Sequence, residues 1–338
     1  MAEETGKILL EVKDLETSFF TDEGIARAVQ DVSFAIPRGK TVGVVGESGC
    51  GKSVTAMSIM GLVAEPGRVT AGEILFRKDE TAEPIDLLKL TQKQLRKYRG
   101  KHLAMIFQEP MSSLNPVFRI GDQIAEAVRL HHPEMSRQDV EQRAIEMLAK
   151  VRIPEPALRA REYPHQFSGG MRQRAMIAMA LSCEPQMLIA DEPTTALDVT
   201  IQAQILDLLR DLQSTCGMSI MIITHDLGVI AEMAEEVVVM YASKVVEKTS
   251  TKTLFAKPLH PYTLGLLRSR PELGNVHENG GMKKKLYTIP GAVPSPLCFP
   301  SGCKFHPRCD RCQAICREKE PDLLEIEPGH TVRCHLVK

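Results

Sequence analysis

The sequence predicts an α/β fold built on a parallel sheet, with further units attached to it. Three short apolar runs rich in β-branched residues, each followed by a helical pattern, carry this prediction: TVGVVG (41–46), QMLIAD (186–191) and SIMIIT (219–224). Runs that are apolar throughout are typical of parallel strands buried on both faces. The 338 residues also exceed the roughly 100 to 200 of one domain, so we expect a main domain and an appendage.

Composition and charge set the broad class of the protein. Charged residues make up 25 % and hydrophobic residues 43 %, as in an ordinary globular chain. A net charge of -1 and a pI of about 6.8 give no basic surface for nucleic acid. MAEETGKILLEV lacks the pattern of a secretory signal, and no apolar run approaches the ~18 residues of a membrane span. We therefore expect a cytoplasmic chain, in which clustered cysteines favour metal or redox chemistry over disulfides.

A phosphate-binding loop follows the first strand. GESGCGKS (46–53) fits the pattern G-x-x-x-x-G-K-[ST] and lies between that strand and the helical pattern SVTAMSIMGLV. Lys52 would reach the outer phosphates, and Ser53 can ligate Mg²⁺. The glycines let successive backbone N–H groups turn towards phosphate at the start of the helix, namely Gly46, Gly49 and Gly51.

The region from Leu87 to about Ser182 is expected to be mostly helical. SRQDVEQRAIEMLAKV (136–151) opens with a capping box of Ser136 and Asp139, and one face of the predicted helix carries Val140, Ala144, Leu148 and Val151. A short apolar strand precedes Gln108 within this region. After Val245 the periodicity weakens and prolines appear, so we expect a separate C-terminal unit there.

Carboxylates and a histidine follow the second and third strands. Asp191 would hold Mg²⁺ through water, and Glu192 would polarise an attacking water. Two acids at this position can also form a helix N-cap, but the preceding phosphate loop favours the metal site. His225 ends the third strand, where a lone histidine is otherwise structural or solvent-facing.

These motifs occur in one order, which resembles that of the nucleotide-binding subunits of ABC transporters. GESGCGKS resembles Walker A, Gln108 the Q-loop glutamine, FSGGM (167–171) the signature, LIADEP Walker B, 196–198 the D-loop and His225 the switch histidine. The resemblance covers at least 11–248. It implies a P-loop ABC ATPase cassette, with a parallel-sheet core, an antiparallel β subdomain and a helical subdomain. We place this nucleotide-binding domain at 1–255 and a small Cys-rich domain at 256–338.

The resemblance also implies an ATP and Mg²⁺ site. It assigns catalysis to Glu192, His225 and Gln108, and Mg²⁺ binding to Ser53, Gln108 and Asp191. The family stacks an aromatic ring on adenine, for which Phe19 is the candidate and Phe20 the competitor. Nucleotide contacts are assigned to Phe19, Gly46, Glu47, Ser48, Gly49, Cys50, Gly51, Lys52, Ser53, Val54, Gln108, Ser168, Gly169, Gly170, Asp191 and Asp198.

The partners that the resemblance implies are a second ABC ATPase subunit and two membrane-spanning permease subunits, served by an external solute-binding protein. The signature, Ser168 to Gly170, would act on the ATP of the other cassette in a sandwich dimer. SSLNPVFRI (112–120) would pass movement to the permeases, which places the chain peripherally on the cytoplasmic face of the membrane. Met171 stands where the common signature LSGGQ has glutamine, as in peptide-importer and nickel-importer ATPases.

The C-terminal segments narrow the substrate class. HPYTLGLL (260–267), IPGAVPSP (289–296), GCKFHPRC (302–309) and GHTVRCHL (329–336) resemble the C-terminal region of oligopeptide/dipeptide importer ATPases. This implies ATP hydrolysis that powers uptake of di- or oligopeptides, with nickel or another small solute as the alternative. An ATPase acting on nucleic acid or ribosomes is disfavoured by the single cassette without heptads, and a non-hydrolysing regulator by the presence of both Glu192 and His225.

Six cysteines lie near the C-terminal end, Cys298 and Cys312 among them. Four thiolates can hold a 4Fe-4S cluster or a tetrahedral Zn²⁺, and a proline-rich tail with a marginal core would be stabilised by either. The family pattern, associated with a 4Fe-4S cluster, matches Cys303, Cys309, Cys316 and Cys334, so we expect the cluster ahead of Zn²⁺. The spacing of Cys309, Cys312 and Cys316 is an alternative ligand set, with reserve ligands His306, His330 and His335.

Overall fold

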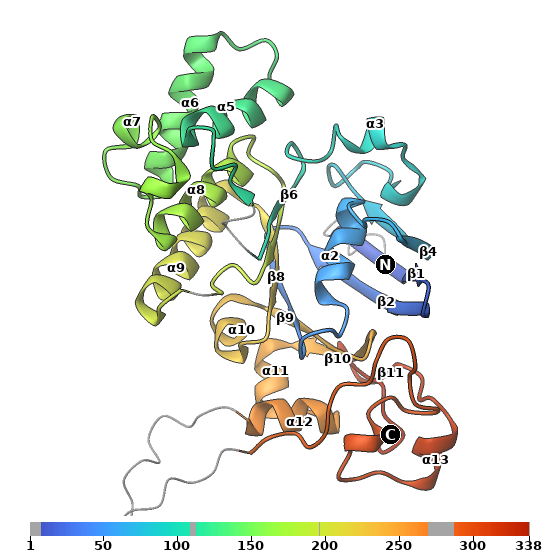
Figure 1. Ribbon diagram of the computed structural model, residues 1–338. Helices are drawn as coiled ribbons and strands as arrows, with labels where there is room; N and C mark the ends of the chain where they lie inside the picture. The colour runs from blue at the N-terminus through green and yellow to red at the C-terminus, as the bar shows by residue number, and fades with distance from the viewer. Residues whose placement is uncertain (1–7, 109–112, 196, 270–286, 338) are drawn as a thin grey trace, which may run out of the picture.

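The computed structural model describes residues 8–108, 113–195, 197–269 and 287–337, and it contains two sheets (Figure 1). The smaller is antiparallel, in the order β2-β1-β4-β5. Its strands are β1 (Ile8–Thr21), β2 (Gly24–Pro37), β4 (Gly67–Phe76) and β5 (Ile85–Asp86). This confirms the antiparallel β subdomain that the family resemblance implies.

The larger sheet has eight strands in the order β11-β12-β10-β9-β3-β8-β7-β6. The five from β9 to β6 are parallel to one another, whereas β9 pairs antiparallel with β10. They are β9 (Glu236–Tyr241), β3 (Thr41–Val45), β8 (Ser219–Thr224), β7 (Met187–Asp191) and β6 (Leu103–Ile106). Every residue of β3, β7 and β8 is buried, which confirms the three strands predicted from their continuous apolar runs.

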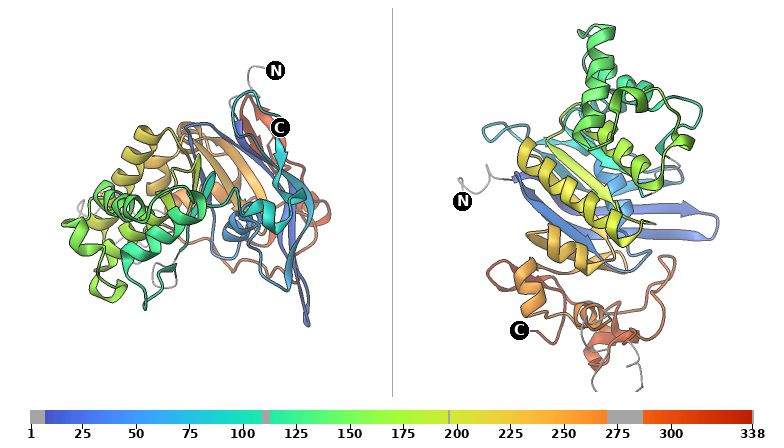
Figure 2. Two further views of the ribbon diagram at one scale, coloured as in Figure 1. Left: turned by 90° about the horizontal axis from the view of Figure 1, so that it is seen from above. Right: turned by 90° about the vertical axis from the view of Figure 1, so that its left-hand side faces the viewer.

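Two hydrophobic cores explain why these strands are apolar on both faces. In β8, Met221 and Ile223 join the core between the two sheets, whereas Ile220 and Ile222 join the core on the opposite face. Helix α2 (Lys52–Met60) lies between the sheets, and α9 (Val199–Cys216) covers the other face of the main sheet (Figures 1 and 2). The phosphate loop is thus held between packed layers.

The predicted helical region forms a lobe beside the main sheet (Figure 2, right). Its helices are α5 (Ile120–His131), α6 (Arg137–Lys150), α7 (Pro156–Arg159) and α8 (Gly169–Leu181), and η1 (Leu87–Lys89) and α3 (Gln92–Leu95) precede them. Ser136 caps α6 by accepting the Asp139 N–H, and the predicted apolar face is buried. One segment of the region expected to be helical, β6, is instead a strand of the main sheet, as the apolar run before Gln108 predicted.

The C-terminal residues extend the main sheet, although we expected a separate unit. Strand β10 (Lys244–Ser250) is followed by α11 (Thr251–Ala256) and α12 (Pro261–Arg268), then by α13 (Ala314–Glu318), β11 (Leu324–Glu327) and β12 (His330–Val332). β12 pairs antiparallel with β10, Glu247 lying opposite Val332. β12 therefore covers the backbone groups of β10, and this continuity does not support the separate Cys-rich domain that we expected.

The lengths and compositions of the helices bear on membrane insertion. Within the described ranges, no helix is both long and apolar enough to cross a bilayer.

Candidate functional site

The phosphate loop joins β3 to α2, as predicted. The φ angles of the three loop glycines lie in a region that residues other than glycine rarely adopt. They are 155° at Gly46, 79° at Gly49 and 103° at Gly51. A Cβ on Gly46 would lie 2.2 Å from the Met240 carbonyl oxygen, and one on Gly51 would lie 2.3 Å from that of Ala28. The backbone path of the loop therefore requires glycine at both packed positions.

Lys52 lies folded into its own loop. Its Nζ donates to the carbonyl oxygens of Gly46, at 2.8 Å, and Glu47, at 3.0 Å, and the side chain is buried. Cys50 is fully buried, and burial raises the pKa of its thiol against the opposing effect of the Lys52 charge. Because a protonated buried thiol is a poor nucleophile, Cys50 serves as a small core residue.

The two predicted Mg²⁺ ligands on different elements meet beside the loop. Ser53, in the first turn of α2, donates its hydroxyl to Asp191 Oδ1 over 3.1 Å. Burial, and to a lesser degree the neighbouring Glu192 charge, raises the pKa of Asp191. A divalent cation at this position would favour the ionised carboxylate, so the pair fits the binding of Mg²⁺.

Glu192 is the centre of a polar cluster built from three loops. Its carboxylate accepts from Gln108 Nε2, at 3.2 Å, and from the Thr195 hydroxyl, at 2.8 Å, and its Oε1 lies 3.2 Å from Nδ1 of His225. Burial alone would raise the pKa of Glu192, but the hydrogen bonds with Thr195 and His225 outweigh it and keep the pKa below its usual value. The carboxylate therefore stays ionised and can accept a proton.

Sequence reasoning missed one residue of this cluster and one that holds the loop beside it. Thr195 follows Glu192 by three positions, a spacing at which a hydroxyl reaches back to a carboxylate in a tight turn. Gln173 of α8 donates to the Pro193 carbonyl oxygen over 2.6 Å and so ties the signature helix to the loop after β7. Only the short spacing of Thr195 was visible in the sequence.

The signature and the D-loop begin two neighbouring helices. Ser168 caps α8 and accepts the Met171 N–H, and Asp198 caps α9 and accepts the Ile201 N–H. A Cβ on Gly170 would lie 2.9 Å from Ile201, so the two helix starts pack closely. Ala196 of the D-loop lies outside the described residues.

Other predicted residues lie at the surface. Ser48 and Gly49 are exposed at the loop tip, and Val54 is half-buried in the first turn of α2. Ser112 of the segment 112–120 lies outside the described residues, whereas the apolar side chains of Val117 and Phe118 in that segment are exposed.

The two candidate aromatic residues differ in their surroundings. Phe19 is half-buried in β1, and its ring lies against Gly67 of β4, where an added Cβ would be 2.5 Å from it. Phe20 is exposed, and the Arg68 guanidinium lies over its ring, 4.2 Å from the centroid. One face of Phe20 is therefore already covered by a cation.

The four cysteines of the family pattern line one cavity. Cys303, Cys309, Cys316 and Cys334 share it with His260, His306 and His335, whereas Cys298 and Cys312 do not line it. Burial, reinforced by the neighbouring thiols, raises the pKa of Cys303 to about 11. Burial also raises the pKa of Cys309 and of Cys334. Without a metal, Cys303, Cys309 and Cys334 are therefore protonated at neutral pH.

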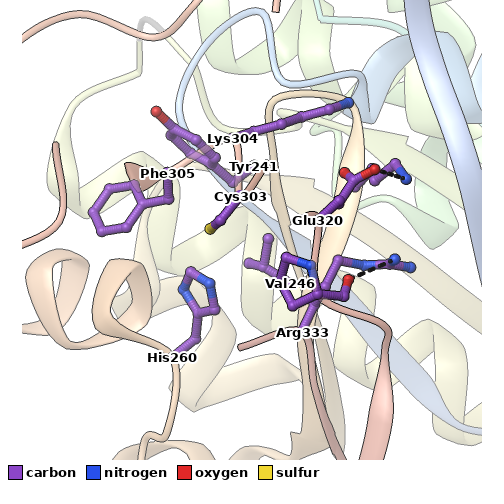
Figure 3. Close-up of a pocket in the computed structure, with 10 residues that line it drawn as sticks. Tyr241, Val246, His260, Cys303, Lys304, Phe305, Glu320 and Arg333 are labelled. Atoms are coloured by element: carbon purple, nitrogen blue, oxygen red, sulfur yellow. Dashed lines mark hydrogen bonds and ion pairs between the residues drawn. The ribbon is translucent and has the colours of Figure 1, made fainter. Parts of the chain in front are cut away.

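A formed metal centre is not supported. Among the described residues, no group of three or more His, Cys, Asp or Glu side chains is placed to hold a metal ion. The predicted Zn²⁺ and 4Fe-4S sites therefore gain no direct support, although the four thiols line one cavity. A neighbouring cavity has Cys303, Tyr241, Phe305 and His260 in its lining (Figure 3).

Comparisons with known proteins match the motifs and the fold. Residues 29–195 match the ABC transporter family, and residues 246–316 match the C-terminal region of oligopeptide/dipeptide transporters. The chain is 50 % identical over 329 residues to the oligopeptide transport ATP-binding protein AppD of Bacillus subtilis, covering 97 % of this chain and 96 % of AppD. It is 46 % identical over 327 residues to the dipeptide transport ATP-binding protein DppD of Escherichia coli, with 97 % and 96 % covered.

A solved structure supports the same assignment. The ATP-binding cassette MJ0796, a dimer in a post-hydrolysis state bound to ADP and Pi, is similar with a TM-score of 0.64 and 27 % sequence identity. The match covers 72 % of this chain and 99 % of that cassette.

Proposed function

Because this chain belongs to the ATP-binding subunits of oligopeptide/dipeptide ABC transporters, we propose that Glu192, Gln108 and His225 form the centre at which it hydrolyses ATP. The observation that supports this most is that Gln108 and His225 both contact the ionised carboxylate of Glu192. These residues come from the ends of different strands, so the fold gathers them where open α/β sheets bind their ligands.

In the proposed reaction, a water oxygen attacks the γ-phosphorus of ATP and the bond to the bridging oxygen of ADP breaks. Glu192 orients that water and accepts its proton, Gln108 holds the carboxylate in place, and His225 contacts the γ-phosphate. The phosphates rest on the loop Gly46 to Ser53, with Lys52 released from its own loop carbonyls to meet them. Positioning and electrostatic stabilisation supply most of the rate in such transfers.

Mg²⁺ fits the pair of Ser53 and Asp191, with Gln108 as the further proposed ligand. The hydroxyl and the buried carboxylate are already within hydrogen-bonding distance, and oxygen ligands are those that Mg²⁺ prefers. When bound, the cation neutralises charge that develops on the phosphates.

The signature is proposed to act on the nucleotide of a second cassette, either a copy of this chain or a related one. Ser168 and the glycines that follow begin α8, where free backbone N–H groups attract phosphate. The related cassette MJ0796 is dimeric, which supports this arrangement. Phe19 is proposed to stack on adenine, and Asp198 to complete the site.

The chain is proposed to work at the cytoplasmic face of the membrane with two permease subunits and an external binding protein. The exposed Val117 and Phe118 follow Gln108 in sequence and supply apolar contacts for a permease. We retain the cassette at 1–255 and the C-terminal region at 256–338 as a proposal. Nickel or another small solute is the alternative substrate.

Uptake of labelled dipeptides and of nickel by cells lacking this chain tests the substrate. We expect peptide uptake to fall and to return with the wild-type gene but not with the Glu192→Gln gene. Unchanged peptide uptake, with nickel uptake lost, would contradict the peptide assignment.

The cavity of Cys303, Cys309, Cys316 and Cys334 is proposed to hold a 4Fe-4S cluster. Each thiolate of such a cluster binds a different iron, so the four sulfurs surround the group and need not meet at one point. Zn²⁺ needs ligands that converge on one ion, and no such group occurs among the described residues, which favours the cluster.

A buried histidine in the same cavity lining is consistent with this. His260 accepts the Tyr262 N–H at Nδ1, so its proton is on Nε2, which is near the backbone of Arg333 but makes no well-formed hydrogen bond among the described residues. Burial lowers the pKa of His260 to about 3, only partly opposed by the backbone of Arg333, so the ring is neutral. A thiolate or sulfide in the cavity would accept the buried N–H.

A further inference from the structure

Glu47, the second residue of the phosphate loop, is held by residues from the C-terminal region. Its backbone N–H donates to the Tyr262 hydroxyl oxygen over 2.8 Å. Its carboxylate accepts two hydrogen bonds from Arg308, Nη1 to Oε2 at 2.7 Å and Nη2 to Oε1 at 3.0 Å. Its carbonyl oxygen accepts from Lys52. Every polar group of Glu47 is therefore engaged within the protein.

The side chain of Arg308 is also held in place by contacts other than those with Glu47. Its Nε donates to the Pro290 carbonyl oxygen over 2.8 Å, and the Tyr241 hydroxyl lies 3.4 Å from Nη1. Only 4 % of the side chain is exposed, and the hydrogen bonds to Glu47 raise its pKa further above the usual value. A planar guanidinium held in this way fixes both the position and the orientation of the carboxylate.

Tyr262 is equally constrained. It is fully buried at the start of α12, and its ring contacts those of Tyr241, with centroids 4.6 Å apart, and Phe305, at 5.5 Å. Burial raises the pKa of its phenol, so the hydroxyl stays neutral at any working pH. Figure 3 shows Tyr241 and Phe305 of this aromatic cluster beside the cavity that Cys303 lines.

The charge of Glu47 gives this contact a consequence for nucleotide binding. A carboxylate within a loop that receives a triphosphate repels it, and the repulsion is strong at short range where solvent is partly excluded. Arg308 compensates that charge through a bidentate ion pair. Tyr262, in turn, holds the backbone of the loop at the residue next to Gly46.

We propose that Tyr262 and Arg308 are positioning residues of the nucleotide site: they fix the phosphate loop at Glu47, and Arg308 cancels the Glu47 charge so that ATP can bind. The inference rests on the proposed role of the loop Gly46 to Ser53 in binding phosphate. It gives the C-terminal region a part in ATP affinity.

Binding of fluorescent ATP with Mg²⁺ to the full chain, under conditions that prevent turnover, tests the proposal. We expect Arg308→Gln to weaken affinity roughly fivefold to thirtyfold, from the uncompensated charge. Tyr262→Phe should weaken it roughly twofold to tenfold, from the unpaired N–H. Arg308→Lys keeps the positive charge but cannot form the bidentate hydrogen bonds of the guanidinium. Its ATP affinity should lie between those of Arg308→Gln and the wild type.

The double variant Glu47→Gln with Arg308→Gln separates charge from general damage. Since both charges are gone, we expect affinity to return to within about threefold of the wild type. Added salt should reduce the difference in ATP affinity between Arg308→Gln and the wild type, because screening weakens the repulsion between Glu47 and the phosphates.

Arg333→Gln is the matched control. Arg333 is also buried, also pairs with a carboxylate, Asp31 at 2.8 Å, and also neighbours a cavity cysteine, but Asp31 lies in β2 and outside the loop. We expect a lower unfolding temperature with unchanged ATP affinity.

Three results would overturn the proposal: wild-type affinity in both Arg308→Gln and Tyr262→Phe, a double variant no better than Arg308→Gln, or an equal loss in Arg333→Gln. If Arg308→Gln does not fold, Tyr262→Phe and Arg308→Lys decide the matter, and wild-type affinity in both overturns it. A wild-type chain that binds no ATP would instead refute the proposed role of the loop.

Discussion

The Glu192 carboxylate lies 3.2 Å from Nδ1 of His225, although 33 residues separate them in the chain. The two side chains meet because β7 and β8 are neighbouring parallel strands whose carboxyl ends share one edge of the sheet. The same edge receives Gln108 after β6, so one carboxylate is contacted from the ends of three strands.

Replacing Glu192 by Gln should abolish turnover while preserving ATP binding. The amide is nearly isosteric but cannot accept the proton of the attacking water, so we expect the rate to fall by about 10² to 10⁴. Phosphate release by the assembled complex measures turnover, and retained labelled ATP measures binding. Glu134→Gln, an exposed change outside the site, is the control, and an unaltered rate in Glu192→Gln would remove Glu192 from its role.

Acid should weaken the fold through Glu192. Against the effect of burial, the hydrogen bonds from Thr195 and His225 hold the folded-state pKa of Glu192 below its usual value. They therefore contribute stability that is present above the unfolded pKa and is lost as the pH falls through the folded pKa. The free energy of unfolding in urea, measured between about pH 6 and pH 3, should therefore fall less steeply in Glu192→Gln than in the wild type. Identical slopes would show that the carboxylate gains nothing from Thr195 and His225.

Alanine at Gly46 and at Gly49 should have different effects. A Cβ at Gly46 would collide with the Met240 carbonyl oxygen, whereas one at Gly49 meets nothing within 4 Å and only strains the backbone. We expect Gly49→Ala to cost about 1 kcal/mol and to keep measurable ATP binding. Gly46→Ala should lose binding by more than tenfold, since the loop must move. Equal affinities in an equilibrium titration would argue against the packing at Gly46.

Removing Glu247 should detach the C-terminal strands. This fully buried carboxylate accepts the N–H groups of Leu259 and His260 and contacts His330 of β12 at 2.8 Å. Glu247→Ala leaves these groups unpaired and should destabilise the chain by about 3 kcal/mol or more. Hydrogen exchange should show early opening of β12. Glu325→Ala, which removes one exposed hydrogen bond to Gly329 in the same region, should have little effect.

The cavity cysteines should bind iron and sulfide together. A chain purified without oxygen should contain about four irons and show a broad absorbance band near ~400 nm. Serine at any one of Cys303, Cys309, Cys316 or Cys334 should reduce both signals, whereas serine at Cys298 or Cys312 should not. One Zn²⁺ per chain without colour would refute the cluster, and so would the absence of any metal.

Local patterns in the sequence were sufficient to predict much of the fold. Strands β3, β7 and β8 were visible because buried parallel strands are apolar on both faces, and α6 because Ser136 and Asp139 mark its start. The residues proposed for the ATP site were visible because their motifs occur in a fixed order. Thr195 was not, since a threonine after an acid is common in turns that have no catalytic role.

Long-range packing was beyond the reach of the sequence. The three residues of β12 are too few for a period, so its pairing with β10 could not be predicted. Arg308 lies among the C-terminal cysteines in the sequence, and no neighbouring residue indicates that it pairs with Glu47 of the phosphate loop. The cysteine spacing predicted a common site; the structure shows a shared cavity, with no formed metal centre among the residues it describes.

The contact between Glu47 and Arg308 also has a bearing on synthesis of the chain, since 261 residues separate them. At 5–20 residues per second, translation of that interval takes roughly 13 to 52 s. For most of this time the nascent chain has its phosphate loop but not yet Tyr262, which follows Glu47 by 215 residues, and Arg308 is added only at the end. A ribosome that stops short of residue 308 therefore leaves a cassette whose Glu47 charge is uncompensated.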